Sequence, residues 1–174
     1  MSRGDTTFAS IGCADCHRPA LTLEDPVFAE PNPFNAPGNL RPSDVPRPFR
    51  FDLTRDGPNP RLERLPDGRA VVRAYTDLKR HVISDDQDEF FNNEHVVQGG
   101  VPTNQFLTRK LWDVGSSAPY GHRGDLTTIE EAILHHAGEA RAARERFAAL
   151  PDPSKRDVIR FLKTLRVLPA GSRR

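Results

Sequence analysis

Long apolar runs, an excess of charge of either sign and methionine are all missing or nearly missing from this chain of 174 residues. No apolar stretch approaches the length of a membrane span. The formal net charge is only +1, from 25 Lys and Arg against 24 Asp and Glu. We therefore expect no membrane span and no nucleic-acid or acidic-membrane partner.

Hydrophobic residues are scarce as well. They make up 36% of the chain, and the mean hydropathy of −0.61 is lean for a core of this size. With 16 Pro and 12 Gly, much of the backbone should be irregular. The length predicts a single domain spanning residues 1–174.

The two cysteines stand in the segment Cys13-Ala-Asp-Cys16-His17. Two thiols at this spacing, followed at once by an imidazole, are typical of the attachment site of a c-type haem. Each sulfur forms a thioether to the porphyrin edge, and His17 reaches the iron. A planar apolar cofactor would also supply interior that the side chains do not, although a partly disordered fragment has the same composition.

The same segment has other interpretations. A Cys-x-x-Cys pair can form a disulfide or a redox-active dithiol, usually near a βαβ pattern, and no such pattern is evident here. It can also supply half of a zinc site, but no further cysteine and no His-x(3–5)-His pair completes a tetrahedron. Covalent haem is the interpretation that we adopt.

The element pattern predicts a mostly α-helical, cytochrome c-like haem domain. Asp5 can cap a first helix, and a proline-dense stretch over residues 19–60 predicts a long loop that wraps the molecule. Pro66-Asp67-Gly68 between two strand-like runs predicts a small β-hairpin. Helices are expected near the C-terminus, with capping signals at Thr127 or Thr128 and at Ser154.

The second axial ligand of the iron decides the function, and methionine is nearly excluded because Met1 is the only one. His136 falls on the apolar stripe of the predicted helix, whereas His135 is rotated by about 100° toward solvent. We therefore predict His136 as the ligand. The alternatives that stay open are His81, His95, His135 and a five-coordinate iron.

Together these segments resemble the C-terminal haem domain of the bacterial di-haem cytochrome c peroxidase superfamily. The nearest branch is that of the di-haem oxidoreductases, also labelled thiol oxidoreductases. The segments that carry the resemblance are CADCH, YTDLKRH (75–81), FLTRKLWDVGSSAPYGHRGDLTTIEEAILHHAGEA (106–140) and DPSKRDVIRFLKTL (152–165). In the peroxidases a ligand to the electron-transfer haem lies fourteen residues after the His of a PY-x-H loop, and from His122 this count reaches His136.

The chain also departs from that family. It carries one Cys-x-x-Cys-His segment, whereas peroxidase chemistry in the family needs two haems. Gly121 and Arg123 replace the bulky apolar residue and the Asp expected on either side of His122. Catalytic activity is therefore not carried over to this chain alone.

The sequence thus predicts a one-electron carrier with one covalent haem c, tethered by Cys13 and Cys16 and ligated by His17 and His136. Trp112, Tyr120 and His122 are candidates to line the haem pocket, although ordinary packing and loop hydrogen bonds explain them equally well.

The expected partner is a redox protein or a second haem domain. The alternative function is the electron-transfer half of a di-haem peroxidase whose second haem domain is missing from this chain. A haem-free thiol oxidoreductase is a third, weaker option. Haem attachment implies a periplasmic location, yet MSRGDTTF lacks the pattern of a secretory signal, so we expect that a leader or preceding segment is absent.

Overall fold

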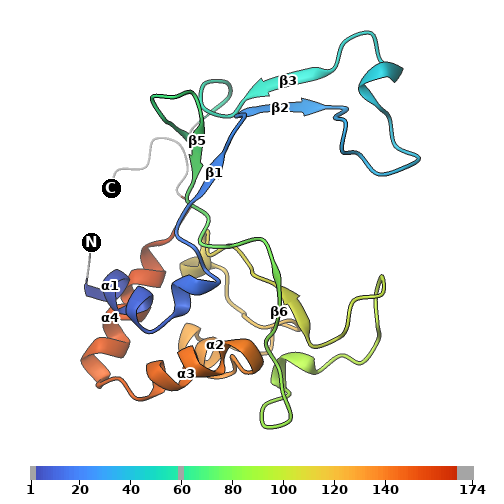
Figure 1. Ribbon diagram of the computed structural model, residues 1–174. Helices are drawn as coiled ribbons and strands as arrows, with labels where there is room; N and C mark the ends of the chain where they lie inside the picture. Colours follow the sequence, from blue (N-terminus) through green and yellow to red (C-terminus); the bar gives the residue numbers. More distant parts are fainter. Residues whose placement is uncertain (1–2, 59–60, 168–174) are drawn as a thin grey trace. The chain divides into compact units, whose positions relative to one another are not determined.

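The computed structural model describes residues 3–58 and 61–167, which fall into two compact units (Figure 1). Unit 1 comprises residues 3–19 and 74–167, and unit 2 comprises residues 20–58 and 61–73. The expectation of a single domain stays a prediction.

Unit 1 holds all the α-helices of the described residues and one short sheet. Its helices are α1 (Arg3–Ser10), α2 (Ile129–Leu134), α3 (Arg141–Ala148) and α4 (Asp152–Thr164). Strands β6 (Arg80–Val82) and β7 (Gln105–Leu107) pair in antiparallel register. Single 3₁₀ turns connect them, namely η1 (Cys13–Asp15), η3 (Phe90–Asn92), η4 (Val114–Ser116) and η5 (Gly138–Ala140).

Unit 2 is built from antiparallel strands. Strands β1 (Leu21–Leu23), β5 (Ala70–Val72) and β4 (Glu63–Arg64) form a sheet in the order β1-β5-β4. Strands β2 (Val27–Glu30) and β3 (Phe49–Asp52) form a separate pair, with the 3₁₀ turn η2 (Pro42–Asp44) in the long connection between them. The predicted hairpin is confirmed as β4–β5, closed by a turn in which Gly68 takes a φ of +95°.

The prediction of a mostly α-helical fold is wrong. Helices take 31% of the structure and strands 17%. The prediction relied on helix signals near the two ends of the sequence. Between them, prolines withhold backbone donors, and residues 20–58 and 61–73 form short strands and turns instead. The segment over residues 19–60 is therefore not simply a loop, and its wrapping of the molecule stays a prediction.

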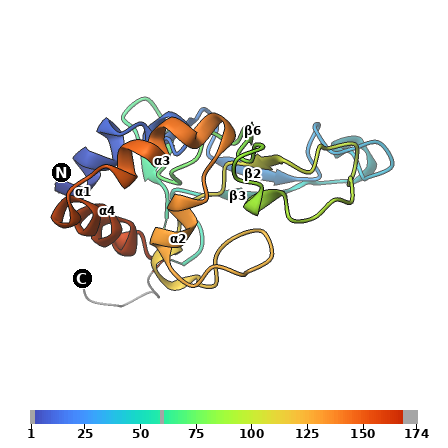
Figure 2. The ribbon, with the colours of Figure 1, turned by 90° about the horizontal axis from the view of Figure 1, so that it is seen from below.

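The core of unit 1 lies where α1 packs against α4, and the two helices lie side by side in both ribbon views (Figures 1 and 2). Gly4 is the point of close approach, because a Cβ atom there would meet the backbone of Asp157 and the side chain of Phe161. The buried members of this core are Phe8, Ile11, Ile129, Phe147, Val158, Phe161 and Leu162.

Two helix starts differ from the sequence prediction and one agrees. The capping box of α2 is confirmed, since Thr128 Oγ1 accepts from the Glu131 N–H and the Glu131 carboxylate accepts from the Thr128 N–H. Helix α1 begins at Arg3, so Asp5 lies in its first turn and is not its cap. Helix α4 begins at Asp152, because a proline in its first turn already has the required φ, so Ser154 is not its cap.

Candidate functional site

The two thiols lie on the 3₁₀ turn η1, directly after α1. Gly12 starts this turn with a φ of +92°, and the His17 N–H donates to the Cys13 carbonyl over 2.9 Å. Both cysteines are partly buried and neither forms a disulfide. Burial raises the pKa of Cys13 to about 11, so the thiol is protonated and unreactive at neutral pH. The turn therefore places two neutral thiols one helical turn apart, next to His17.

His17 is held as a neutral imidazole. Its Nδ1 lies 3.1 Å from the Tyr75 carbonyl oxygen, which places the ring proton on Nδ1 and leaves the Nε2 lone pair available. Burial lowers the pKa of His17 to about 4, and hydrogen bonds to the backbone of Tyr75 and of Arg109 offset only part of that effect. At neutral pH the side chain is thus ready to act as a ligand.

His136 has the same kind of hydrogen bond as His17. The sequence pattern predicted that His136 lies on the apolar face of a helix. Helix α2 ends at Leu134, however, so His136 lies just after the helix. Its Nδ1 lies 2.7 Å from the Ala132 carbonyl oxygen, and burial lowers its pKa. The centres of the His17 and His136 rings are 6.5 Å apart, with their planes inclined at 53°.

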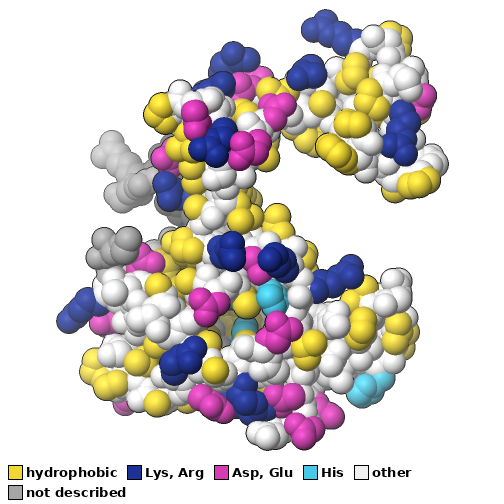
Figure 3. Space-filling view, viewed as in Figure 1, with side chains coloured by type: hydrophobic (Ala, Val, Ile, Leu, Met, Phe, Trp, Pro, Cys, Tyr) yellow, Lys and Arg dark blue, Asp and Glu magenta, His cyan; other side chains and the backbone are white. Residues whose placement is uncertain are grey.

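Aromatic side chains surround this histidine pair. Phe8 lies 6.4 Å from the His17 ring, and Phe91 meets the His136 ring edge-on at 5.5 Å. In the space-filling view, histidine side chains are visible at a hollow in the surface of unit 1, among charged and apolar groups (Figure 3). The rings of Phe8 and Phe91 are thus the aromatic neighbours of His17 and His136.

The three predicted pocket residues lie in different surroundings. His122 has a 40% exposed side chain, with its ring 5.2 Å from Phe106 and its Nε2 3.4 Å from a Glu94 carboxylate oxygen. Phe106 lies 6.5 Å from Phe91, so a row of rings connects His122 to His136.

Trp112 and Tyr120 lie elsewhere in unit 1. Trp112 is 40% exposed and lies beneath the Lys110 ammonium group. Tyr120 packs on the helical core, and its hydroxyl donates to the Val114 carbonyl over 2.6 Å. The role of all three residues at a cofactor stays a prediction.

The other histidines predicted as possible ligands contact different side chains or are exposed. His81 has both ring nitrogens on carboxylates, Nδ1 at 2.8 Å from Glu139 and Nε2 at 2.9 Å from Asp77. His135 stacks on Phe90, with ring centres 4.0 Å apart. His95 is exposed at the surface. Of the histidines predicted as the second ligand, His136 is the one whose ring lies next to that of His17, with 6.5 Å between the ring centres.

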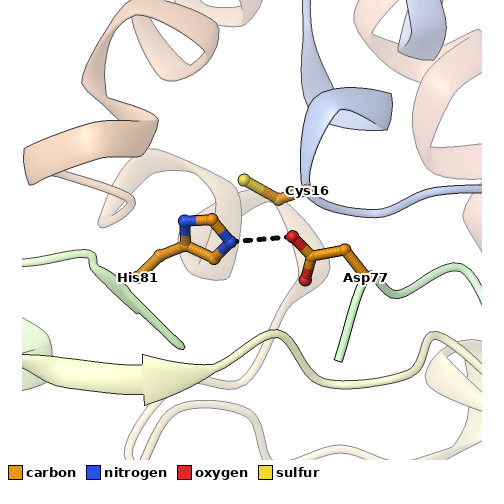
Figure 4. Close-up of side chains that lie close together, drawn as sticks. All are labelled: Cys16, Asp77 and His81. Atoms are coloured by element: carbon orange, nitrogen blue, oxygen red, sulfur yellow. Dashed lines mark hydrogen bonds and ion pairs between the residues drawn. The ribbon is translucent and has the colours of Figure 1, made fainter. Parts of the chain in front are cut away.

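Sequence reasoning missed the carboxylates beside Cys16 (Figure 4). Cys16, Asp77 and His81 place their ligand atoms within 4.8 Å of one another. The spacing of Asp77 and His81 within YTDLKRH was a visible signal. Glu139, which is 58 residues beyond His81, could not be connected to it without the fold.

The comparison with protein families gives one match. Residues 67–165, more than half of the chain, match the family described as "Di-haem oxidoreductase, putative peroxidase". Searches of curated proteins and of solved structures found no significant match.

Unit 1 combines α-helices with a short antiparallel sheet, and two neutral imidazoles lie close together in it. The family match then makes the assignment specific: the chain belongs to the di-haem oxidoreductase family, which confirms the resemblance noted in the sequence. Among the described residues, no helix has both the length and the apolar character that a membrane span requires.

Proposed function

We propose that this chain carries one covalent haem c between His17 and His136 and transfers single electrons through it. The observation that carries the proposal is the 6.5 Å separation of the two ring centres. A metal–nitrogen bond of about 2 Å on each side, plus about 1 Å from each nitrogen to its ring centre, separates two rings on one metal by roughly 6 Å. The separation of 6.5 Å fits two imidazoles on opposite sides of one iron.

The hydrogen bonds of the two histidines support the same role. Metal-bound histidines commonly donate the other ring N–H to a carbonyl or carboxylate, which fixes the tautomer and the ring orientation. Tyr75 and Ala132 provide such carbonyls to His17 and His136. In both residues, Nε2 is thereby left to bind iron.

The side chains around the pair would define the chemistry. The haem supplies a one-electron Fe(III)/Fe(II) couple when bound. Cys13 and Cys16 would tether it, while Phe8 and Phe91 shield the ligands from water. Two imidazole ligands favour Fe(III) relative to a His/Met pair, so the reduction potential should be lower than that of a His/Met cytochrome.

The family assignment favours one alternative, in which this chain is the electron-supplying half of a di-haem oxidoreductase. This chain has a single Cys-x-x-Cys-His segment, so a second haem would come from another domain or a partner protein. A redox partner protein would serve the simple carrier in the same way. Covalent haem attachment implies maturation in the periplasm for either function.

Replacing His136 tests the ligand assignment. In the haem-loaded protein, His136→Ala should convert a low-spin absorption spectrum into a high-spin one and allow carbon monoxide to bind the reduced iron, because one axial position opens. His135→Ala is the matched control, since that ring stacks on Phe90 and should leave the spectrum unchanged. A low-spin spectrum in the His136→Ala protein would refute the assignment.

A further inference from the structure

Exposed side chains gather on the surface of unit 1 where β6 pairs with β7. The register places Arg80 opposite Leu107, and the Thr108 N–H donates to the Lys79 carbonyl over 2.8 Å. The segments over residues 78–80 and 107–112 are thereby held side by side. We call their exposed residues the basic patch, which consists of Leu78, Lys79, Arg80, Leu107, Arg109, Lys110 and Trp112.

The apolar members of the basic patch are large and face solvent. Leu78 is 62% exposed, Leu107 49% and Trp112 40%. The backbone of Leu78 is left-handed, with a φ of +57°, and Thr76 Oγ1 accepts from the Leu78 N–H over 3.0 Å. A leucine rarely adopts this conformation, which here holds an apolar side chain at the surface. Exposed apolar groups that cluster, tryptophan above all, are typical of contact surfaces between proteins.

Four cations accompany these apolar groups. In the described part of the chain, no carboxylate forms an ion pair with Lys79, Arg80, Arg109 or Lys110. The Lys110 ammonium group lies 5.9 Å from the centre of the Trp112 ring. The positive charge of the patch is therefore available to an anionic partner.

The neighbouring carboxylates do not neutralise the patch. Asp77 is only 5% exposed and pairs with His81, and Glu139 pairs with the same imidazole. Asp113 follows Trp112 at the edge of the patch. The formal net charge of +1 for the whole chain thus conceals a local excess of positive charge at β6 and β7.

The basic patch lies next to the groups that hold His17. The Tyr75 carbonyl, three residues before Leu78, accepts from His17 Nδ1 over 3.1 Å. The backbone of Arg109 also hydrogen bonds to the His17 ring. A protein docked on the patch would therefore lie close to the proposed iron ligand. Because electron transfer slows steeply with distance, this position suits a partner that exchanges electrons.

We propose that the basic patch docks an acidic one-electron redox protein beside His17. The proposal rests on the proposed function, since the partner exchanges its electron with the haem. The cations attract the acidic partner before contact, and the apolar residues make the contact itself. Transient redox complexes have small interfaces, in agreement with the size of the patch.

Reduction of the haem-loaded full-length chain by a flavodoxin, followed by stopped flow, tests the proposal. Flavodoxins are acidic, and their anionic hydroquinone gives one electron to Fe(III), which leaves a neutral semiquinone and Fe(II) without proton transfer. The second-order rate constant should fall at least about tenfold as the salt concentration rises from about 0.01 M to about 0.5 M. A rate constant that does not change with salt would overturn the proposal.

A basic acceptor should behave in the opposite way. Electron transfer from the Fe(II) chain to an oxidised cytochrome c of high positive charge should become faster as salt is added, because like charges then repel each other less. If this reaction instead slows as salt is added, the patch does not set the charge of the docking surface.

Charge reversal within the patch locates the docking surface. Arg80→Glu combined with Lys110→Glu should lower the rate constant with flavodoxin at least about tenfold at low salt. Arg156→Glu combined with Lys163→Glu is the matched control, because both residues are exposed on α4 and the net charge changes equally. The control should stay within about twofold of the unmodified chain. Equal losses in the two double variants would show an effect of net charge alone and overturn the proposal.

Two further measurements protect this comparison from an effect on the haem or on folding. Both double variants should keep the low-spin spectrum, and at about 0.5 M salt the rate constants of all three proteins should converge, because screening removes the charge effect. Arg80→Gln combined with Lys110→Gln is a milder change and should lower the rate constant about threefold at low salt. An unchanged rate constant in that protein would contradict the docking surface.

An anionic lipid surface is the rival occupant of such a patch. Vesicles of phosphatidylserine and phosphatidylcholine at about 0.15 M salt should bind the unmodified chain no better than the Arg80→Glu, Lys110→Glu protein. Vesicle binding that this double variant loses, together with an unchanged rate constant with flavodoxin, would assign the patch to a membrane surface and overturn the proposal.

The docking and haem proposals fail separately. A haem-loaded chain whose patch variants react as the unmodified chain does contradicts only the docking surface. A chain that holds no haem contradicts the proposed function, and oxidised flavodoxin then tests the patch by itself. Its binding should shift the backbone amide NMR signals of residues 78–80 and 107–112, and signals that do not move would overturn the docking surface.

Discussion

At the residue scale, hydrogen bonding at Nδ1 separates the histidines into two kinds. His17 and His136 each direct Nδ1 to a backbone carbonyl, and burial lowers the pKa of both, so both imidazoles are neutral at pH 7. His81 directs both nitrogens to carboxylates. The hydrogen bonds to Glu139 and Asp77 raise its pKa, so it favours the protonated state. The same side chain thus serves two different purposes within one unit.

The raised pKa of His81 predicts a pH-dependent contribution to stability. Its stabilisation is complete below the pKa of an unfolded histidine, about 6.5, and is lost as the pH rises through the folded pKa. His81→Gln should lower the free energy of unfolding by about 2 kcal/mol at pH 6, typical of hydrogen bonds to charged groups, and by less at pH 9. Urea unfolding of the haem-free chain at both pH values measures this.

His95→Gln is the control for that experiment, because His95 is exposed. It should leave the free energy of unfolding nearly unchanged at both pH values. Equal losses from His81→Gln at pH 6 and pH 9 would mean that His81 is not charged in the folded protein.

The pKa of Asp77 is shifted in the opposite direction from that of His81. Its backbone hydrogen bond from Lys79 and its hydrogen bond from His81 outweigh burial and lower its pKa to about 2. The stabilisation from Asp77 is therefore present above the pKa of an unfolded aspartate and is lost only as the pH falls toward 2. The pair is most stabilising between these two limits, in mildly acidic solution.

At the element scale, the contact between α1 and α4 positions the turn η1 that carries Cys13, because η1 follows α1 after only two residues. Gly4 permits that contact, since any Cβ atom there would collide with the backbone carbonyl group of Asp157. The position of Cys13 and Cys16 thus depends on the small residue Gly4, which lies earlier in the same segment.

Gly4→Ala should therefore destabilise unit 1. Glycine to alanine in a helix normally gains up to about 1 kcal/mol. Here the collision should reverse the sign and cost about 2 kcal/mol in the free energy of unfolding, as overpacking does. Ala9→Ser, on the exposed side of the same helix, should be nearly neutral in the same urea titration. A Gly4→Ala protein as stable as the unmodified chain would contradict this packing.

Several elements were predictable because their signals are local. The box of Thr128 and Glu131 gave the start of α2, and Pro66-Asp67-Gly68 gave the β4–β5 hairpin. Strands β2 and β3 were not predicted, because Val27 pairs with Asp52 across a long proline-rich connection that hides the pairing. The end of α2 before His136 was missed as well, since the helix stops without a proline or a glycine at that point.

At the scale of the whole molecule, the scarcity of hydrophobic residues is matched by a small core. The buried apolar cluster of unit 1 is confined to residues around α1, α3, α4 and the start of α2. The histidine pair lies beside it, against Phe8 and Phe91. A bound porphyrin would extend this cluster, in agreement with the lean composition.

The candidate site was predictable to a greater extent than the fold. The Cys-x-x-Cys-His segment and the distance from His122 to His136 are properties of the sequence alone, and the structure places the centres of the His17 and His136 rings 6.5 Å apart. The cluster of Cys16, Asp77, His81 and Glu139 needed the fold, because it joins three separate parts of the chain.

The central claim is that an iron porphyrin is covalently attached to this chain, and one sample tests it directly. The chain should be expressed in a periplasm that attaches haem, and its reduced pyridine haemochrome spectrum and intact mass measured together. The account predicts a c-type spectrum at one haem per chain, a mass increased by one haem, and thiols that no longer react with an alkylating reagent. A colourless protein of unmodified mass, with Cys13 and Cys16 both open to alkylation, would contradict it.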